Sequence, residues 1–270
     1  MRGNSDLYGL GNSGLFEGER VKSLLQAISF LTILPVGHLP LPHEKELASS
    51  MAFFPLVGFL IGLLSALGHF LFIFILPKSL ALWFTIGLFA FITRGLHLDG
   101  FADTVDGLSS GGTREKILEV MRDSRIGAFG VISLILLIGA KYFALDQIPN
   151  SFIPQSLMLM AVMGRNSMVL VTYRSPYARS EEGLAKPFTE NIRSREMALS
   201  IASAFGIALL LIGVKGILVF LGAGIFSLGY RFFFIKKLGG VTGDILGAAN
   251  ELAELLSIIL LVILERIDIV

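Results

Sequence analysis

The 270-residue chain contains no cysteine, and only 16% of its residues are charged. The absence of cysteine excludes a disulfide framework and a thiolate metal site, and it leaves the redox compartment open. Soluble domains carry roughly 25% charged residues, whereas this chain is 54% hydrophobic with a mean hydropathy of +0.76. Its net charge of +1 gives no indication of a nucleic-acid partner. The composition therefore indicates a membrane protein.

Seven apolar segments approach the length of about 20 residues that a bilayer-crossing helix needs. They are 51–76, 79–94, 127–146, 152–173, 197–212, 216–235 and 245–264. An eighth segment, 21–36, is short and contains Pro35, so it is interpreted as a re-entrant or interfacial helix. The first 20 residues lack the apolar stretch of a signal peptide and are expected to form a flexible tail. The prediction is an all-α polytopic membrane protein, with about seven transmembrane helices and one helical domain at 21–270.

Lysine and arginine are concentrated in three connections, at 94–125, 174–195 and 231–244. The connections between them carry only Lys78 and Lys215. Because basic connections favour the cytoplasmic side of a membrane, these three segments are expected to face the cytoplasm.

Three aspartates lie at the end of the second apolar segment, at spacings of four and three residues: Asp99, Asp103 and Asp106. An α-helix repeats about every 3.6 residues, so these side chains would share one face of a helix. Oxygen ligands of this kind suit Mg²⁺, which commonly binds a few carboxylates together with substrate phosphates. A calcium EF-hand is excluded, because Phe101 occupies its second ligand position. The alternative is a solvated loop just past a helix end.

A second acidic position, Asp123, follows on the same side of the membrane. It would either complete a metal site or orient Arg122 and Arg125, and a surface ion pair is the simpler alternative. Further along the chain, Arg179 and its aromatic neighbours could hold a phosphate or anchor the chain at the membrane interface.

Further carboxylates lie just before the last apolar segment and inside it. Asp244 and Glu251 are seven residues apart and would share a helix face, with Glu254 nearby. An unpaired carboxylate inside a membrane is costly, so Arg165 and Asn166 of another apolar segment are the expected partners of the two glutamates. A structural intramembrane ion pair and a functional site both remain open.

The chain resembles the cobalamin synthase family, also called adenosylcobinamide-GDP ribazoletransferase. The resemblance lies in LHLDGFADTVDGL at 96–108, MRDSRIGAFG at 121–130 and GGVTGDILGA at 239–248, continued by Glu251 and Glu254. It implies an Mg²⁺-dependent enzyme of the prokaryotic inner membrane, with its active site on the cytoplasmic side. The implied substrates are a corrinoid nucleotide, adenosylcobinamide-GDP, and α-ribazole or its 5′-phosphate, which are joined with release of GMP. The oligomeric state is left open.

These expectations assign a role to each candidate residue. Mg²⁺ would be held by Asp99, Asp103 and Asp106, with Asp123 as a further ligand. Asp244 or Glu251 would be the general base or a ligand of a second metal. The phosphates would be bound by Arg94, Arg122, Arg125 and Arg179.

Two other classes of protein fit parts of the sequence. A CDP-alcohol phosphotransferase would share the opening Asp103-Thr-Val-Asp-Gly107, but Ser110 and Gly111 stand where its motif requires Ala-Arg. An ion- or proton-coupled transporter would use Glu251 and Glu254 as a relay, but the two halves of the chain show no inverted repeat. A purely structural scaffold would not need clustered carboxylates.

Overall fold

The protein is described by a computed structural model covering residues 11–37 and 39–267. Within these residues the structure consists of helices and their connections, without a β-strand. The α-helices are α1 (Gly11–Leu31), α2 (Glu44–Ser50), α3 (Phe54–Ile75), α4 (Lys78–Ile92), α5 (Leu96–Ser109), α6 (Arg114–Val120), α7 (Ala128–Asp146), α8 (Ile153–Thr172), α9 (Lys186–Asn191), α10 (Ser194–Leu238) and α11 (Gly243–Arg266). Two short 3₁₀ helices, Met51–Phe53 and Asn150–Phe152, precede α3 and α8.

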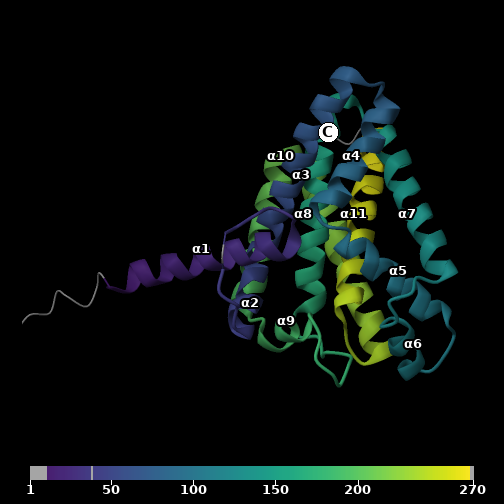
Figure 1. The fold of residues 1–270 in the computed structure, drawn as a ribbon. Coiled ribbons are helices and arrows are strands. Elements are labelled where there is room, and N and C mark those ends of the chain that lie inside the picture. Colours follow the sequence, from purple (N-terminus) through teal and green to yellow (C-terminus); the bar gives the residue numbers. More distant parts are fainter. Residues whose placement is uncertain (1–10, 38, 268–270) are drawn as a thin grey trace, which may run out of the picture.

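Helix α8 lies in the middle of the bundle, where it packs against α3, α10 and α11 (Figure 1). Nearly all of its side chains are buried, including those of Arg165 and Asn166. Both α3 and α8 begin with a proline in the first turn, where a missing N–H leaves no helical hydrogen bond unmade. The central position of α8 explains how polar residues are accommodated in an apolar segment, because their partners come from the surrounding helices.

The helices that are long and apolar enough to cross a membrane bear on the predicted number of seven membrane-crossing helices. Four helical stretches of the described residues are long and apolar enough to cross a membrane, or five if a bent pair counts as one span. The predicted segments are all helical, but α4 has only 15 residues and α8 carries buried polar side chains. The sequence count of seven is therefore not confirmed.

The bent pair consists of α4 and α5, which meet at an angle of 89°. The backbone turns at Arg94 and Gly95, whose φ angles of 55° and 64° lie in the left-handed region. Glycine adopts this region readily, but a left-handed arginine is strained by about 1–3 kcal/mol and is held there only by the surrounding structure. The turn redirects the chain so that α5, with its aspartates, runs across the bundle.

Helix α10 covers two of the predicted spans and reverses direction between them. Ile212 and Gly213 have non-helical backbone angles, with φ of 59° at Gly213. On either side of this point the rings of Phe205 and Phe220 lie 5.6 Å apart, although 15 residues separate them in sequence. A straight helix would place them about 22 Å apart at 1.5 Å per residue. The two arms of α10 are therefore antiparallel neighbours.

The three basic connections meet at one end of the bundle. Arg114 donates to the carbonyl oxygen of Leu238 at 2.7 Å and to that of Ala178 at 2.6 Å, which ties the three segments together. Lys78 and Lys215 bind partners elsewhere, at the end of α7 and at Glu265 near the end of α11. Figure 1 shows α6 and α9 at one end of the bundle and the α3–α4 connection at the other. The expected grouping of the basic connections on one side is confirmed as a feature of the fold.

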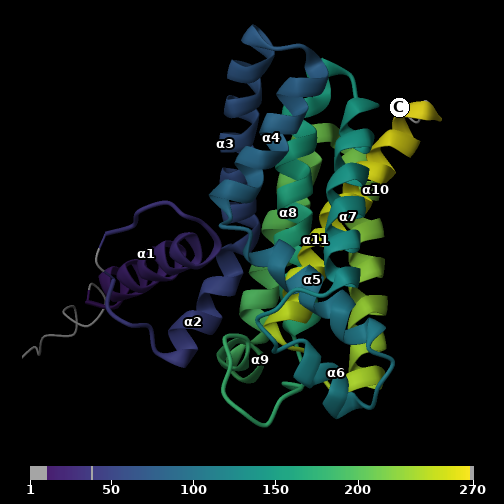
Figure 2. The ribbon, with the colours of Figure 1, turned by 45° about the vertical axis from the view of Figure 1, so that its right-hand side comes forward.

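Helix α1 lies across the direction of the bundle and packs on α2 and α3 (Figures 1 and 2). Lys22 on α1 is paired with Glu46 on α2 at 2.8 Å. α1 is not among the helices of the described residues that are long and apolar enough to cross a membrane, and its predicted re-entrant or interfacial placement stays a prediction. It begins at Gly11, so the predicted boundary at residue 20 falls inside α1. Residues 1–10 of the predicted tail lie outside the described residues.

Candidate active site

The close packing of α5 on α11 brings two of the three aspartates of α5 towards Asp244. A Cβ atom on Gly100 would lie 2.9 Å from the Cα atom of Asp244, and one on Gly247 would lie 3.3 Å from the Cα atom of His97. Glycine at both positions lets the two backbones approach closely, which larger residues would prevent. Asp99 and Asp103 are on the helix that this contact holds against α11.

A cavity of about 200 Å³, here called the acidic cavity, lies at this contact. Its wall includes Asp99 and His97 of α5, Asp244 of α11 and Arg179 of the connection before α9. Arg179 Nη2 donates to Asp244 Oδ2 at 2.9 Å, and the Thr242 hydroxyl donates to the same oxygen at 3.2 Å. The Nε atom of Arg179 is buried and has no hydrogen-bond partner. A negatively charged ligand would satisfy this donor.

Asp103 lies half-buried one helical turn beyond Asp99. It is within the electrostatic reach of three other carboxylates, Asp99, Asp244 and Asp106, and of one cation, Arg179. Carboxylates clustered in this way repel one another unless a proton or a cation reduces their charge. The cluster therefore favours a cation close to Asp103.

Asp106, a predicted metal ligand, has a different set of partners. Its Oδ2 atom accepts the N–H of Gly127 and its Oδ1 atom accepts the N–H of Gly130, both at 2.7 Å. These donors belong to the beginning of α7, where backbone N–H groups have no partner within the helix. Asp106 thus connects α5 to the start of α7, with both carboxylate oxygens already bonded.

Asp123 and its neighbouring arginines form surface ion pairs. Asp123 is bonded to Arg125 through two side-chain contacts, of 2.7 and 3.0 Å, and these lower the pKa of Asp123 to about 2. Arg122 is paired with Glu181 of the connection before α9. No interaction joins these residues to Asp103 within the described part of the chain. The structure therefore places Arg122 and Arg125 outside the acidic cavity.

Arg94 lies in the wall of a second and larger cavity, of about 900 Å³, which also includes Asp99. Its guanidinium donates to the carbonyl oxygen of Ser29 at 2.8 Å and so connects the α4–α5 turn to α1. Of the four predicted phosphate-binding arginines, Arg179 and Arg94 thus lie beside the aspartates of α5.

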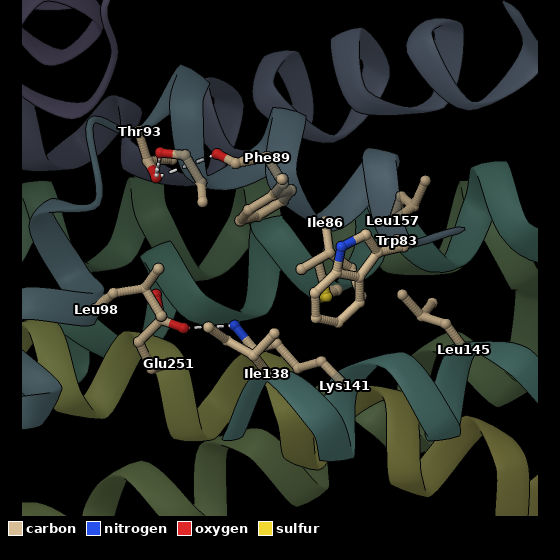
Figure 3. Close-up of a pocket in the computed structure, with 13 residues that line it drawn as sticks. Trp83, Ile86, Phe89, Thr93, Leu98, Ile138, Lys141, Leu145, Leu157 and Glu251 are labelled. Carbon is tan, nitrogen blue, oxygen red and sulfur yellow. Dashed lines mark hydrogen bonds and ion pairs between the residues drawn. The ribbon is translucent and has the colours of Figure 1, made fainter. Parts of the chain in front are cut away.

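Glu251 lies in a buried ion network instead of the acidic cavity. Lys141 of α7 donates to Glu251 and to Glu254, each at 2.5 Å, and Arg165 of α8 is paired with Glu254. Figure 3 shows Lys141 and Glu251 at the wall of an apolar cavity of about 220 Å³ lined by Trp83 and Phe89. The prediction that Arg165 pairs with these glutamates is confirmed for Glu254, whereas Asn166 accepts a hydrogen bond from Ser200 instead.

Lys141 is the residue that sequence reasoning missed. Its side chain is buried, and the single lysine of an apolar segment is a signal of a buried partner. Two cations and two carboxylates balance the charge of the network. The network also reaches the acidic cavity, because Arg165 lies 3.5 Å from Nδ1 of His97.

The carboxylates around the acidic cavity offer only oxygen atoms to a metal ion. Among the described residues, no three histidine, aspartate or glutamate side chains are placed to hold a metal by themselves. Asp99, Asp103 and Asp244 nevertheless supply oxygen ligands only, which suits Mg²⁺, and this ion usually completes its shell with waters and phosphate oxygens. The donor chemistry of these carboxylates is therefore suited to a magnesium ion whose remaining ligands are waters or phosphate oxygens.

Comparisons with known proteins give a consistent result over most of the chain. Residues 23–262 match the family model described as cobalamin-5-phosphate synthase. The chain is 42% identical to adenosylcobinamide-GDP ribazoletransferase of Syntrophobacter fumaroxidans, over 85% of this chain and 94% of that protein. Proteins of the same name from Acetivibrio thermocellus and Geotalea daltonii are 36% and 37% identical, and the matches cover 89% and 87% of this chain and 97% and 95% of those proteins. No solved structure matches the chain.

Proposed function

Because the chain belongs to the cobalamin-5-phosphate synthase family, we propose that its acidic cavity is where adenosylcobinamide-GDP is joined to α-ribazole or its 5′-phosphate with release of GMP. The observation that carries this proposal is the convergence of Asp99, Asp103, Asp244 and Arg179. Phosphoryl transfer depends mainly on holding the phosphates in position and neutralising their charge, and this group of residues can do both.

The proposed magnesium site consists of Asp99 and Asp103 of α5, which leaves Asp244 of α11 free for another role. Mg²⁺ bound there would neutralise charge on the diphosphate. Asp106 is a weaker candidate because two backbone N–H groups already occupy its oxygens. Asp123 is held by Arg125 at the surface.

The reaction requires a positioned cation and a base. Arg179, with its unpartnered Nε atom, would hold a phosphate oxygen of the diphosphate. The ribazole hydroxyl forms a bond to the phosphorus next to the aminopropanol arm of the corrinoid, and the bond from this phosphorus to the bridging oxygen breaks. GMP leaves with that oxygen, and the hydroxyl proton passes to Asp244. Asp244 is the better candidate for this base, because it lies in the acidic cavity, whereas Glu251 lies in the wall of another cavity beside Lys141.

The direct test measures GMP release from adenosylcobinamide-GDP in membranes that contain the protein. We expect release that requires both ribazole and Mg²⁺. Asp103→Asn should lower turnover by about a hundredfold or more, the usual effect of removing one electrostatic contact to a transition state. Release that is unaffected by this variant would remove Asp103 from the site. Solute uptake into proteoliposomes without GMP release would instead favour a transporter.

We also propose that the end of the bundle with the basic connections faces the cytoplasm of a prokaryotic inner membrane. The chain has no cysteine, so single cysteines can be placed without background labelling. Ser109→Cys lies at the basic end and Ser151→Cys follows α7 at the opposite end, and both positions are exposed. A thiol reagent that cannot cross membranes should label Ser151→Cys in intact spheroplasts and Ser109→Cys only after lysis. The reverse pattern would contradict the proposed orientation.

A further inference from the structure

A larger cavity lies beside the acidic cavity. We call it the α1 cavity, because Gln26, Ser29 and Phe30 of α1 form one wall. The other walls come from the connection at 39–42, from α2, from the α4–α5 turn and from Leu134 of α7. It shares four residues with the acidic cavity: Phe30, Leu96, Asp99 and Leu184. The two cavities are therefore neighbours, with a carboxylate of the proposed reaction site in their common wall.

The sizes of the two cavities differ in a way that matches the two parts of the donor substrate. Sites for small molecules usually occupy about 300–1,000 Å³. The acidic cavity, at about 200 Å³, falls below this range and suits a diphosphate. The α1 cavity, at about 900 Å³, lies near its upper limit and suits the broad corrin ring. The apolar cavity of about 220 Å³ beside Lys141 is too small for that ring.

The chemistry of the α1 cavity agrees with its size. Its lining is mainly apolar, with Leu39, Leu47 and Leu134 among its walls. A corrin ring has apolar faces and a rim of amide groups. Gln26 is buried, with 4% of its surface exposed, and its Oε1 atom has no hydrogen-bond partner. A buried acceptor without a partner is costly, and an amide N–H group of the ring would supply one.

We infer that the α1 cavity binds the corrin ring of the donor, so that the aminopropanol arm crosses the shared wall at Asp99 and presents its phosphate to the acidic cavity. This inference rests on the proposed function for the identity of the substrate. In this arrangement, α1 and the connection at 39–42 contact the corrin ring. The α4–α5 turn lies between the ring and the phosphates.

The test separates the two ends of the donor by using a probe for each. Adenosylcobinamide carries the ring without the nucleotide, and GDP carries the diphosphate without the ring. Equilibrium dialysis of the purified protein in detergent gives a dissociation constant for each probe. No turnover is needed, so a failure of this inference can be told apart from a failure of the proposed reaction.

Two variants on the same helix provide the matched comparison. Leu134→Trp fills the α1 cavity, whereas Ile138→Trp, one turn further along α7, fills the apolar cavity beside Lys141. We expect Leu134→Trp to weaken adenosylcobinamide binding by about tenfold or more, because the added volume excludes the ring. GDP binding to this variant, and adenosylcobinamide binding to Ile138→Trp, should stay within about twofold of wild type.

A third variant tests the same inference without changing the volume of the cavity. Gln26→Leu should weaken adenosylcobinamide binding by about three- to tenfold, the effect of one lost hydrogen bond. Its elution as a single species in size-exclusion chromatography shows that it is folded. Unchanged binding in both Leu134→Trp and Gln26→Leu overturns the inference. A loss of ring binding caused by Ile138→Trp alone, or wild-type protein that binds GDP but not adenosylcobinamide, also overturns it.

Discussion

Removing Lys141 tests the buried ion network of α7, α8 and α11. In the wild-type protein, Lys141 and Arg165 balance the charges of Glu251 and Glu254, and all four side chains are at most 7% exposed. In Lys141→Met, one guanidinium would remain for two carboxylates. It is paired with Glu254, so the only hydrogen bond left to Glu251 would be the 3.4 Å contact from Asn250. Removing one partner of a buried ion pair typically costs about 3–5 kcal/mol, because the other charge stays buried. We expect a loss of stability of this size.

The double variant Lys141→Met/Glu251→Gln measures the charge balance itself. It removes one cation and one carboxylate together, while Glu254 keeps Arg165 and a 2.9 Å hydrogen bond from Asn250. Because the remaining network is neutral, the double variant should recover most of the stability that the single variant loses.

Equilibrium unfolding in mixed micelles, with a rising fraction of denaturing detergent, gives the free-energy differences. Lys215→Met is the matched control, because Lys215 forms a single 3.0 Å pair with Glu265 and both side chains are partly exposed. This control should lose no more than about 1 kcal/mol. A single variant at position 141 that is as stable as the control, or a double variant no more stable than the single one, would refute the reasoning.

Three further predictions concern the packing and the acidic residues of α5. Asp106→Asn should lose about 1–2 kcal/mol of stability, because it weakens bonds to two backbone N–H groups at the start of α7, and thermal unfolding in detergent measures this. Gly100→Ala should lower both stability and GMP release, by about 1–3 kcal/mol for stability, because its Cβ atom would clash with the α11 backbone. Gly139→Ala, which meets nothing within 4 Å, is its control and should be neutral. Asp123→Asn should lower GMP release far less than Asp103→Asn, and equal losses in the two variants would contradict the surface role of Asp123.

Local spacing was sufficient to predict part of the candidate site. Asp99 and Asp103 are four residues apart, and the structure places them on a helix with both near Asp244. The same spacing also grouped Asp106 with them, but that side chain reaches the start of α7. Helical periodicity fixes which side chains share a face. It carries no information about which neighbouring element offers them a partner.

Pairing inside the bundle was predicted only in part, for a similar reason. Because an unpaired carboxylate inside a membrane is costly, Arg165 was the expected partner of the glutamates of α11. Arg165 is paired with Glu254. Lys141, separated from Glu251 by 110 residues, was not assigned to this network. The cost of burying an unpaired charge predicts that each carboxylate has a cationic partner. The packing of the helices decides which residue that partner is.

The sequence by itself determined the helical segments, their apolar character and the family of the protein, because these depend on composition, local periodicity and motifs. The tertiary structure decided that α5 turns away from α4, that α10 folds back on itself and that the acidic and α1 cavities share Asp99. These features arise from contacts between residues far apart in the chain, where close approach of two backbones and the balance of buried charge select one arrangement.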